Sequence, residues 1–315
     1  MRNVSGRLRR LMLAFGLALA PLAAAAQSSP DPAAPPAVPE AILKEAREAW
    51  QAAAAAAQRG PADIALLDEA RLHLPVGTAF IPAAQAARLL RSWGNRVTAD
   101  PAGLVVGTGA DDQWSVIIRF VGEGYIKDDD AKNWNAGEML ESLREGNDTA
   151  NVERRNRGFP ETEIVGWIAP PSYDPATHFL VSSIAQRDKG ESDSAVRGIN
   201  YLTYALGRNG YFSLDLLSSS DRFESDRAAA TPVLNGLDYN AGHRYADFNA
   251  SSDHIAAYGL AALVGVVAVK KLGLLALAGV FLLKFAKLGA IAVAVIGGTV
   301  ARLFRRKAKP TGDVG

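Results

Sequence analysis

The sequence INYLTYALGRNGYFSLDLL, residues 199–217, decides the fold class. It holds two runs rich in leucine, aromatic and β-branched residues, Ile199 to Leu206 and Tyr211 to Leu217, and such runs are typical of β-strands. Asn209 and Gly210 between them can both adopt the positive φ angles that a two-residue hairpin turn requires. We therefore expect an antiparallel β-hairpin here.

Further strand patterns lie on both sides of this hairpin along the chain. Runs rich in valine, isoleucine and aromatic residues predict strands at Val76 to Ile81, Leu104 to Val106, Trp114 to Val121, Glu163 to Ile168 and Phe179 to Ala185. The last two flank a segment from Pro170 to Pro175 that reads as a turn. Most connections are too short for crossover helices, which favours antiparallel pairing.

Four segments within the same region have helical patterns. Pro82 is suited to the first position of a helix that ends at Gly94. Asn135 and Glu138 resemble a capping box, and we expect Gly146 to separate this helix from a second, polar one at Thr149 to Asn156. A helix that contains Phe223 should end near Leu234. The predicted fold is α+β, a mostly antiparallel sheet flanked by helices.

The first 60 residues predict an exported protein. A basic start, an apolar stretch and an Ala-x-Ala pattern make residues 1–26 a signal peptide. Residues 27–60 combine a Pro-rich linker with an Ala-rich helix from Glu40 to Arg59, which could dock on the domain, dock on a partner or stay solvated. The α+β domain should span residues 61–249 and lie in the periplasm.

An apolar run from Ile255 to Ala301 predicts a C-terminal transmembrane helical segment. We assign residues 255–304 to the membrane and residues 305–315 to a basic cytoplasmic tail, because basic residues favour the cytoplasmic side. One full crossing fits an exported domain and an internal tail, whereas two crossings would leave the tail outside. The predicted location is the bacterial inner membrane, with the domain held close to the lipid bilayer by a short tether after Phe248.

Charge and cysteine content exclude several classes of function. Residues 27–254 carry a net charge of −11 although the whole chain carries +1, and an acidic domain repels phosphate backbones, so we expect no nucleic-acid partner. The chain has no cysteine, which excludes disulfides and thiolate chemistry.

The sequence predicts no catalytic residue, metal ligand set or cofactor. Lys127 to Asp130 is the sharpest polar cluster; it could offer carboxylate oxygens to a divalent cation, but we favour its interpretation as turn and helix-start acids. Arg155 lies in a basic group that could pair with an anion or with neighbouring acids. The candidate binding residues are Lys127, Asp128, Asp130, Trp134, Arg155 and Arg208.

The stretch GYIKDDDAK, residues 124–132, resembles a signature of domain-of-unknown-function family 2167. Other matching stretches are Gly94-Asn95, Asn151, Glu153-Arg154, Arg157 to Pro160, Val165 to Trp167, Tyr173-Asp174, Asn200-Tyr201, Leu206 to Arg208, Tyr245 to Phe248 and Ala256 to Leu260. The resemblance implies a membrane-anchored bacterial envelope protein and no assigned activity.

These observations favour a non-enzymatic binding or scaffold module at the inner membrane. Its expected partners are the lipid bilayer and an envelope protein, and a homo-oligomer is also open. Two alternatives are a periplasmic divalent-metal-dependent hydrolase built on Asp128, Asp130 and His178, and an accessory subunit of a membrane complex that docks through the Ala-rich helix.

Overall fold

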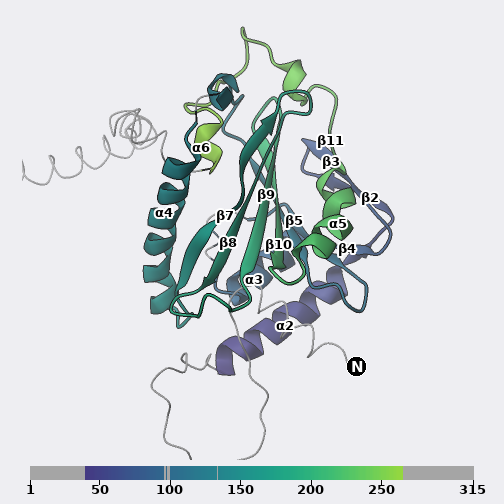
Figure 1. Cartoon of the computed structure of the whole chain (residues 1–315). Helices are drawn as coiled ribbons and strands as arrows, with labels where there is room; N and C mark the ends of the chain where they lie inside the picture. Colours follow the sequence, from purple (N-terminus) through teal and green to yellow (C-terminus); the bar gives the residue numbers. More distant parts are fainter. Residues whose placement is uncertain (1–39, 96, 98–99, 133, 265–315) are drawn as a thin grey trace, which may run out of the picture. The chain divides into compact units, whose positions relative to one another are not determined.

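The computed structural model describes residues 40–95, 97, 100–132 and 134–264. An antiparallel sheet of eight strands runs through it, and Figure 1 shows its strands side by side. The order across the sheet is β1 (Gln58–Arg59), β4 (Thr78–Pro82), β5 (Gly103–Gly107), β6 (Ser115–Val121), β10 (Tyr211–Ser219), β9 (Gly198–Leu206), β8 (Phe179–Asp188) and β7 (Thr162–Asp174).

The predicted hairpin is confirmed as β9 and β10, in which Tyr211 pairs with Leu206 and Leu217 with Asn200. Its turn needs a glycine at Gly210, where φ is +153° and an added Cβ would lie 2.0 Å from the carbonyl oxygen of Val121. Only glycine tolerates both conditions, so β6 can follow the other edge of β10 closely.

A second sheet of three strands was not predicted. It consists of β11 (Leu237–Tyr239), β3 (Ala70–Leu74) and β2 (Ala62–Leu66) in that order. Along β3, buried residues alternate with exposed ones, so only one face of this small sheet joins the core. The alternation at Leu72 and Leu74 is visible in the sequence and could have revealed this strand.

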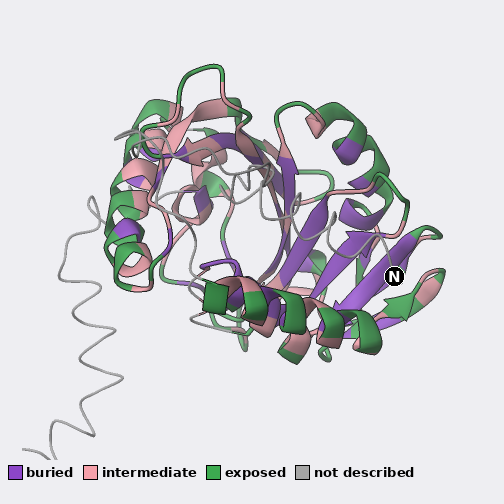
Figure 2. Cartoon of the chain, turned by 90° about the horizontal axis from the view of Figure 1, so that it is seen from below, coloured by how far each residue is buried: buried purple, intermediate pink, exposed green. Residues whose placement is uncertain are grey.

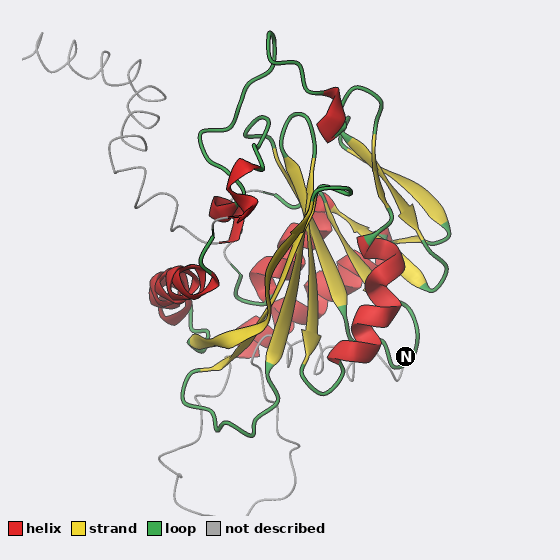
Figure 3. Cartoon of the chain, turned by 45° about the horizontal axis from the view of Figure 1, so that its top comes forward, coloured by secondary structure: helices red, strands yellow, loops and turns green. Residues whose placement is uncertain are grey.

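Helices cover both faces of the large sheet (Figure 3). The helices α2 (Glu40–Ala56) and α3 (Ala83–Ser92) pack on one face, over β4 and β5, and α5 (Phe223–Leu234) packs on the other. A long helix, α4 (Ala136–Asn156), lies beside the edge strand β7 (Figure 1). The α+β class and the large antiparallel sheet flanked by helices are thereby confirmed.

The Ala-rich helix docks on the domain, which resolves one alternative. Ala46, Ala49 and Ala53 on α2 are fully buried. The Arg88 guanidinium donates two hydrogen bonds to the Glu45 carboxylate, at 2.8 and 3.0 Å. Small alanine side chains let α2 approach α3 closely, and the ion pair fixes the two helices in register.

Two separate hydrophobic cores follow from the alternation of side chains across the strands. On one face, Phe212, Leu214 and Leu216 of β10 join α5 and the small sheet. On the other, Leu217 of β10 and Ile117 of β6 pack with α2 and α3. Figure 2 shows the buried positions concentrated on the strands and on the helix sides that face them.

Two local predictions were wrong. Gly146 does not interrupt α4, which continues to Asn156; a helical glycine costs about 1 kcal/mol, and the bonds of Asn147 and Asn151 to the carbonyl oxygen of Thr162 hold the helix in place. The segment at Pro170 is not a turn but part of β7, with several register shifts. An edge strand tolerates proline because one side needs no partner.

The C-terminal end of the described chain belongs to the folded domain. Residues 255–264, which the sequence analysis placed in the membrane segment, pack on it, and Leu260 and Val264 are buried. A short helix, α6 (Ala261–Val264), ends this part. Within the described residues, no helix is long and apolar enough to cross a bilayer. The signal peptide, the Pro-rich linker, the tail and residues 265–304 of the predicted membrane segment lie outside them.

The first prediction concerns the larger core. Phe212 is fully buried, and its ring lies 4.9 Å from that of Phe120 and 5.7 Å from that of Tyr239, centre to centre. Phe212→Ala should lower the free energy of unfolding by about 3–5 kcal/mol, because the cavity cannot fully collapse. Val76→Ala is the control, since Val76 is 76% exposed. Chemical denaturation measures both, and equal effects would contradict the assignment of this core.

Candidate functional site

Asp128 is linked to the turn between β7 and β8. The Tyr173 hydroxyl donates to Asp128 Oδ2 at 2.8 Å and lies 3.0 Å from His178 Nδ1. Because the hydroxyl has one hydrogen, His178 must donate from Nδ1 to the tyrosine oxygen. His178 has a φ of +57°, a conformation that few residues other than glycine adopt. The contact therefore fixes an unusual turn.

Asp130 has a different task. Its carboxylate accepts hydrogen bonds from the backbone N–H groups of Leu260 (3.0 Å) and Ala261 (3.1 Å), at the start of α6. Gly259 permits this approach, because an added Cβ there would lie 2.5 Å from Asp130 Oδ2. Asp130 thus caps α6, the last helix of the described part of the chain.

The two carboxylates are engaged separately and do not form a shared cation site. Among the described residues, no group of three or more His, Asp or Glu side chains is placed to bind a metal ion. The proposed hydrolase residues Asp128 and His178 are joined through a tyrosine hydroxyl instead.

Three other predicted residues do not gather with this cluster. Lys127 is exposed and Trp134 is half-buried. Arg155 on α4 forms an ion pair with Glu161 and is 53% exposed. An exposed pair of this kind contributes little to stability, so Arg155 behaves as part of a solvated helix face.

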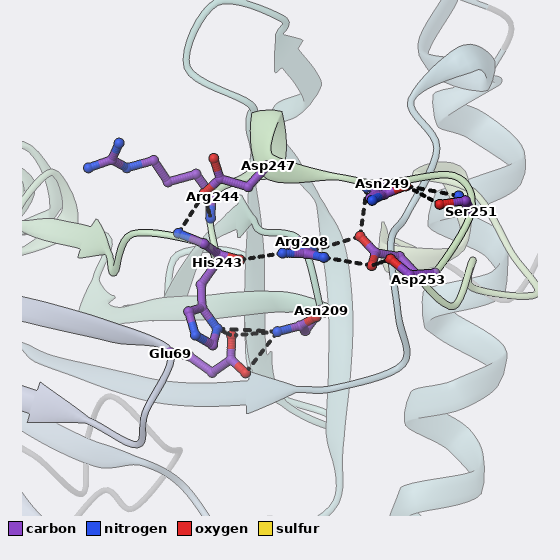
Figure 4. Close-up of polar contacts among 11 residues, drawn as sticks. Glu69, Arg208, Asn209, His243, Arg244, Asp247, Asn249, Ser251 and Asp253 are labelled. Atoms are coloured by element: carbon purple, nitrogen blue, oxygen red, sulfur yellow. Dashed lines mark hydrogen bonds and ion pairs between the residues drawn. The ribbon is translucent and has the colours of Figure 1, made fainter.

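Arg208 fastens the C-terminal strap, which we define as residues 249–264, to the hairpin turn (Figure 4). Its guanidinium donates two hydrogen bonds to Asp253, at 2.7 and 2.8 Å, and a third to the carbonyl oxygen of Gly242. Arg208 holds the pKa of Asp253 well below its usual range.

Further contacts lie next to those of Arg208 with Asp253 and Gly242. Asn209 in the hairpin turn donates to Glu69, and His243 Nδ1 lies 2.8 Å from the same carboxylate (Figure 4). The strap also pairs with Tyr125, whose N–H donates to the His254 carbonyl oxygen at 2.8 Å. The rings of Tyr125 and Phe248 stack with centres 3.9 Å apart. The predicted residues Asp130 and Arg208 therefore serve to hold the strap.

A polar pocket with a volume of about 210 Å³ lies elsewhere, on the sheet face that α2 and α3 cover only in part. Residues of β6, β8, β9 and β10 line it, and α4 and the segment after α3 contribute Arg154 and Asn95. Along β10 the residues on this face change from Leu217 to Asp215 and Ser213. The sheet face that α2 and α3 cover is thus apolar beneath these helices and polar beyond α3.

Several buried polar atoms of this pocket have no hydrogen-bond partner among the described residues. They are Asp188 Oδ1, Arg154 Nη2, Asn95 Nδ2 and Asp215 Oδ1. A buried polar atom without a partner costs about 1–3 kcal/mol, and such atoms are rare in folded proteins. Four such atoms around one pocket make it the candidate binding site.

Burial shifts the ionisation of these groups. Asp188 is 8% exposed, and burial raises its pKa to about 7, with Glu191 adding to the shift and Arg154 opposing it. Burial likewise lowers the pKa of Arg154. Burial raises the pKa of Asp215 to about 6, although Arg119 donates to it at 2.7 Å. Perturbed groups that line one pocket are a mark of functional sites.

The end of α4 positions Arg154. Its Nε donates to the carbonyl oxygen of Pro160 at 2.7 Å, and its guanidinium lies 5.8 Å from the centre of the Phe159 ring. Arg157 donates to the carbonyl oxygens of Arg91 and Asn95, at 3.1 and 3.2 Å. These contacts join the ends of α3 and α4, so Arg154 and Asn95 are held together.

Sequence reasoning missed Asp188, Asp215 and Arg119. Asp215 and Arg119 lie between apolar residues on β10 and β6, and a charged residue inside an apolar strand pattern is an uncommon signal. Asp188 stands between Arg187 and Lys189 at the end of β8, where the sequence carries no such signal. The predicted residues Asp128 and His178 lie far away: His178 precedes β8 and Asp188 ends it. Ten strand residues span about 33 Å.

The second prediction concerns the strap. Arg208→Ala removes the only cation that the described residues place in an ion pair with Asp253, which is 9% exposed, so the strap should detach from the hairpin turn. Hydrogen exchange of the full-length protein should speed up across residues 249–264. Arg155→Ala is the control, because that side chain contacts only the surface at Glu161. An unchanged exchange rate in Arg208→Ala would show that the ion pair between Arg208 and Asp253 is not needed to hold the strap on the domain.

Known proteins offer few comparisons. No curated protein matches the chain. The solution structure of cyanobacterial PsbP (CyanoP) from Synechocystis sp. PCC 6803 is similar at a TM-score of 0.33 and 13% identity, over 59% of this chain and 94% of that one. The sequence profile described as "Protein of unknown function (DUF2167)" matches residues 58–297, most of the chain. The chain therefore belongs to the DUF2167 family.

Proposed function

We propose that this protein is a non-enzymatic binding module that takes up a small polar molecule in the pocket between Asn95, Arg154 and Asp188. The observation that supports this most is the set of unpartnered buried polar atoms around that pocket. A ligand that supplied the missing partners would recover the cost of leaving them unpaired. The volume of about 210 Å³ lies just below the range of drug-sized ligand sites, which suits a small molecule.

The alternatives have less support. The hydrolase hypothesis needs Asp128 and Asp130 at one cation, yet their carboxylates contact Tyr173 and the backbone of α6 respectively. The accessory-subunit hypothesis used the Ala-rich helix for docking on a partner, but its alanines face α3 and the sheet. An envelope protein partner or a second copy of the chain would have to bind another surface.

The proposed setting is the bacterial inner membrane, with the domain in the periplasm and the tail in the cytoplasm. The apolar run to Ala301 and the basic residues after it support this proposal. The chain is still packed on the domain at Val264, which already lies within the apolar run. The domain and the proposed lipid anchor are therefore adjacent in the sequence.

The third prediction tests the pocket as a binding site. Val196 lines the pocket and is 49% exposed, whereas Val152 on α4 is 50% exposed and lies outside the pocket lining. Val196→Trp should fill the entrance and abolish ligand-induced shifts in thermal unfolding of the full-length protein, measured against a library of small polar metabolites. Val152→Trp should keep them.

Loss of the shifts in both variants, or in neither, would contradict a binding role for this pocket. Failure of every library member to shift the wild-type protein would also contradict it.

The fourth prediction tests the topology. A reporter that is active only outside the cytoplasm, fused after Gly315, should be inactive, and the same reporter fused after Val264 should be active. The expected pattern follows from one full crossing with the basic end inside. An active reporter at Gly315 would place the tail outside the cytoplasm, as two crossings would, and would overturn the proposed orientation of the tail.

A further inference from the structure

Arg154 and Asp188 offer opposite charges to the same pocket without forming an ion pair. Each shifts the pKa of the other, so they lie within electrostatic reach. No ion pair within 4.0 Å joins them, and both Arg154 Nη2 and Asp188 Oδ1 lack a hydrogen-bond partner among the described residues. Neither group forms a direct ion pair, and leaving their buried atoms without a partner is costly.

Two arginines around the pocket already have partners. Arg119 donates to Asp215 at 2.7 Å, and Arg187 donates to Glu163 and Asp193, at 2.5 Å in both cases. These pairs leave Arg154 and Asp188 as the opposite charges with buried atoms that a ligand would satisfy, and the half-buried Glu191 adds a second carboxylate to the lining. The Asn95 amide adds a hydrogen-bond donor on the side of Arg154.

We infer that the pocket binds a small zwitterion, a molecule with a primary ammonium group and an oxyanion a few atoms apart. This inference rests on the proposed function. The oxyanion accepts from Arg154 Nη2 and Asn95 Nδ2, because charge-assisted bonds from a guanidinium are strong. The ammonium group donates to Asp188 Oδ1.

Other ligand classes satisfy only part of this arrangement. A simple anion leaves Asp188 without a cation, and a simple amine leaves Arg154 without an anion. A neutral sugar gives hydrogen bonds to both residues but neutralises neither charge. A zwitterion satisfies both, and its own charges balance those of the pocket.

This chemistry has two sources, free amino acids and the phosphoethanolamine head group of a lipid. Titration calorimetry of the full-length protein with a panel of L-amino acids and with O-phosphoethanolamine separates them. Propionate and ethylamine serve as single-charge controls for alanine, and phosphocholine lacks the ammonium N–H donors. Vesicles of phosphatidylethanolamine, compared with vesicles of phosphatidylcholine, test the lipid source.

We expect at least one zwitterion to bind, with its single-charge controls about ten-fold weaker or worse. Asp188→Asn should weaken that zwitterion by a similar factor. The variant keeps the shape of the side chain and removes a buried charge, so it should fold. Asp221→Asn, at an exposed position, is the matched control and should bind as the wild type does.

Arg154→Lys keeps a positive charge and should retain part of the affinity, whereas Arg154→Met should lose it. Zwitterion binding that is equal in the wild type and in Asp188→Asn would overturn the inference. So would a neutral or single-charge ligand that binds in a manner sensitive to Val196→Trp while no zwitterion binds; the proposed function would then stand. Absence of any ligand in that pocket would remove both.

Discussion

The alternation of side chains along β10 is the constraint on which the rest of the structure depends. Because successive residues of a strand point to opposite faces, burying Phe212, Leu214 and Leu216 in one core forces Ser213 and Asp215 to the other face. There α2 and α3 cover the strands from β4 to β6, while α4 stands beside β7. The polar pocket lies on the part of this sheet face between α3 and α4.

The ends of α3 and α4 supply polar side chains to this pocket. The link between the ends of α3 and α4, through Arg157 and the backbone after α3, brings Arg154 and Asn95 above the strands. Below them, Asp188 ends β8 opposite Thr162, which is itself bonded to Asn151 on α4. Donors thus come from the helix layer and an unpaired carboxylate from the sheet, an arrangement suited to a ligand with two opposite charges. The site lies at the opposite end of β8 from the strap contacts, so the two features are separate parts of the domain.

Much of the fold was predictable because it rests on local patterns. The Asn209-Gly210 turn, the N-cap at Asn135, whose side chain accepts from Gly137 and Glu138, and α5 all follow from nearby residues. The extension of β7 through Pro170 depends on its place at the sheet edge, and the continuity of α4 through Gly146 depends on contacts with Thr162. Neither is a local property.

The candidate site was less predictable, because it depends on contacts between residues that are far apart in the sequence. The string from Lys127 to Asp130 attracted attention because acids cluster in sequence, yet its carboxylates hold a turn and the strap. Asp188 and Arg154 are 34 positions apart and meet only through the packing of α4 beside β7. A charge pattern along the chain does not reveal which charges will be buried without partners.

The pocket depends on Asp188, which is buried and forms no ion pair with Arg154. With its pKa raised, the native state holds a proton that the unfolded chain releases, so this residue contributes stability below about pH 4 and loses that contribution as the pH rises through about 7. Arg154 and Glu191 are the charged groups that act on it. An NMR titration of the Asp188 carboxyl carbon in the full-length protein measures this directly, and we expect a midpoint near 7. A midpoint below about 4, as for a carboxylate paired with Arg154, would contradict it.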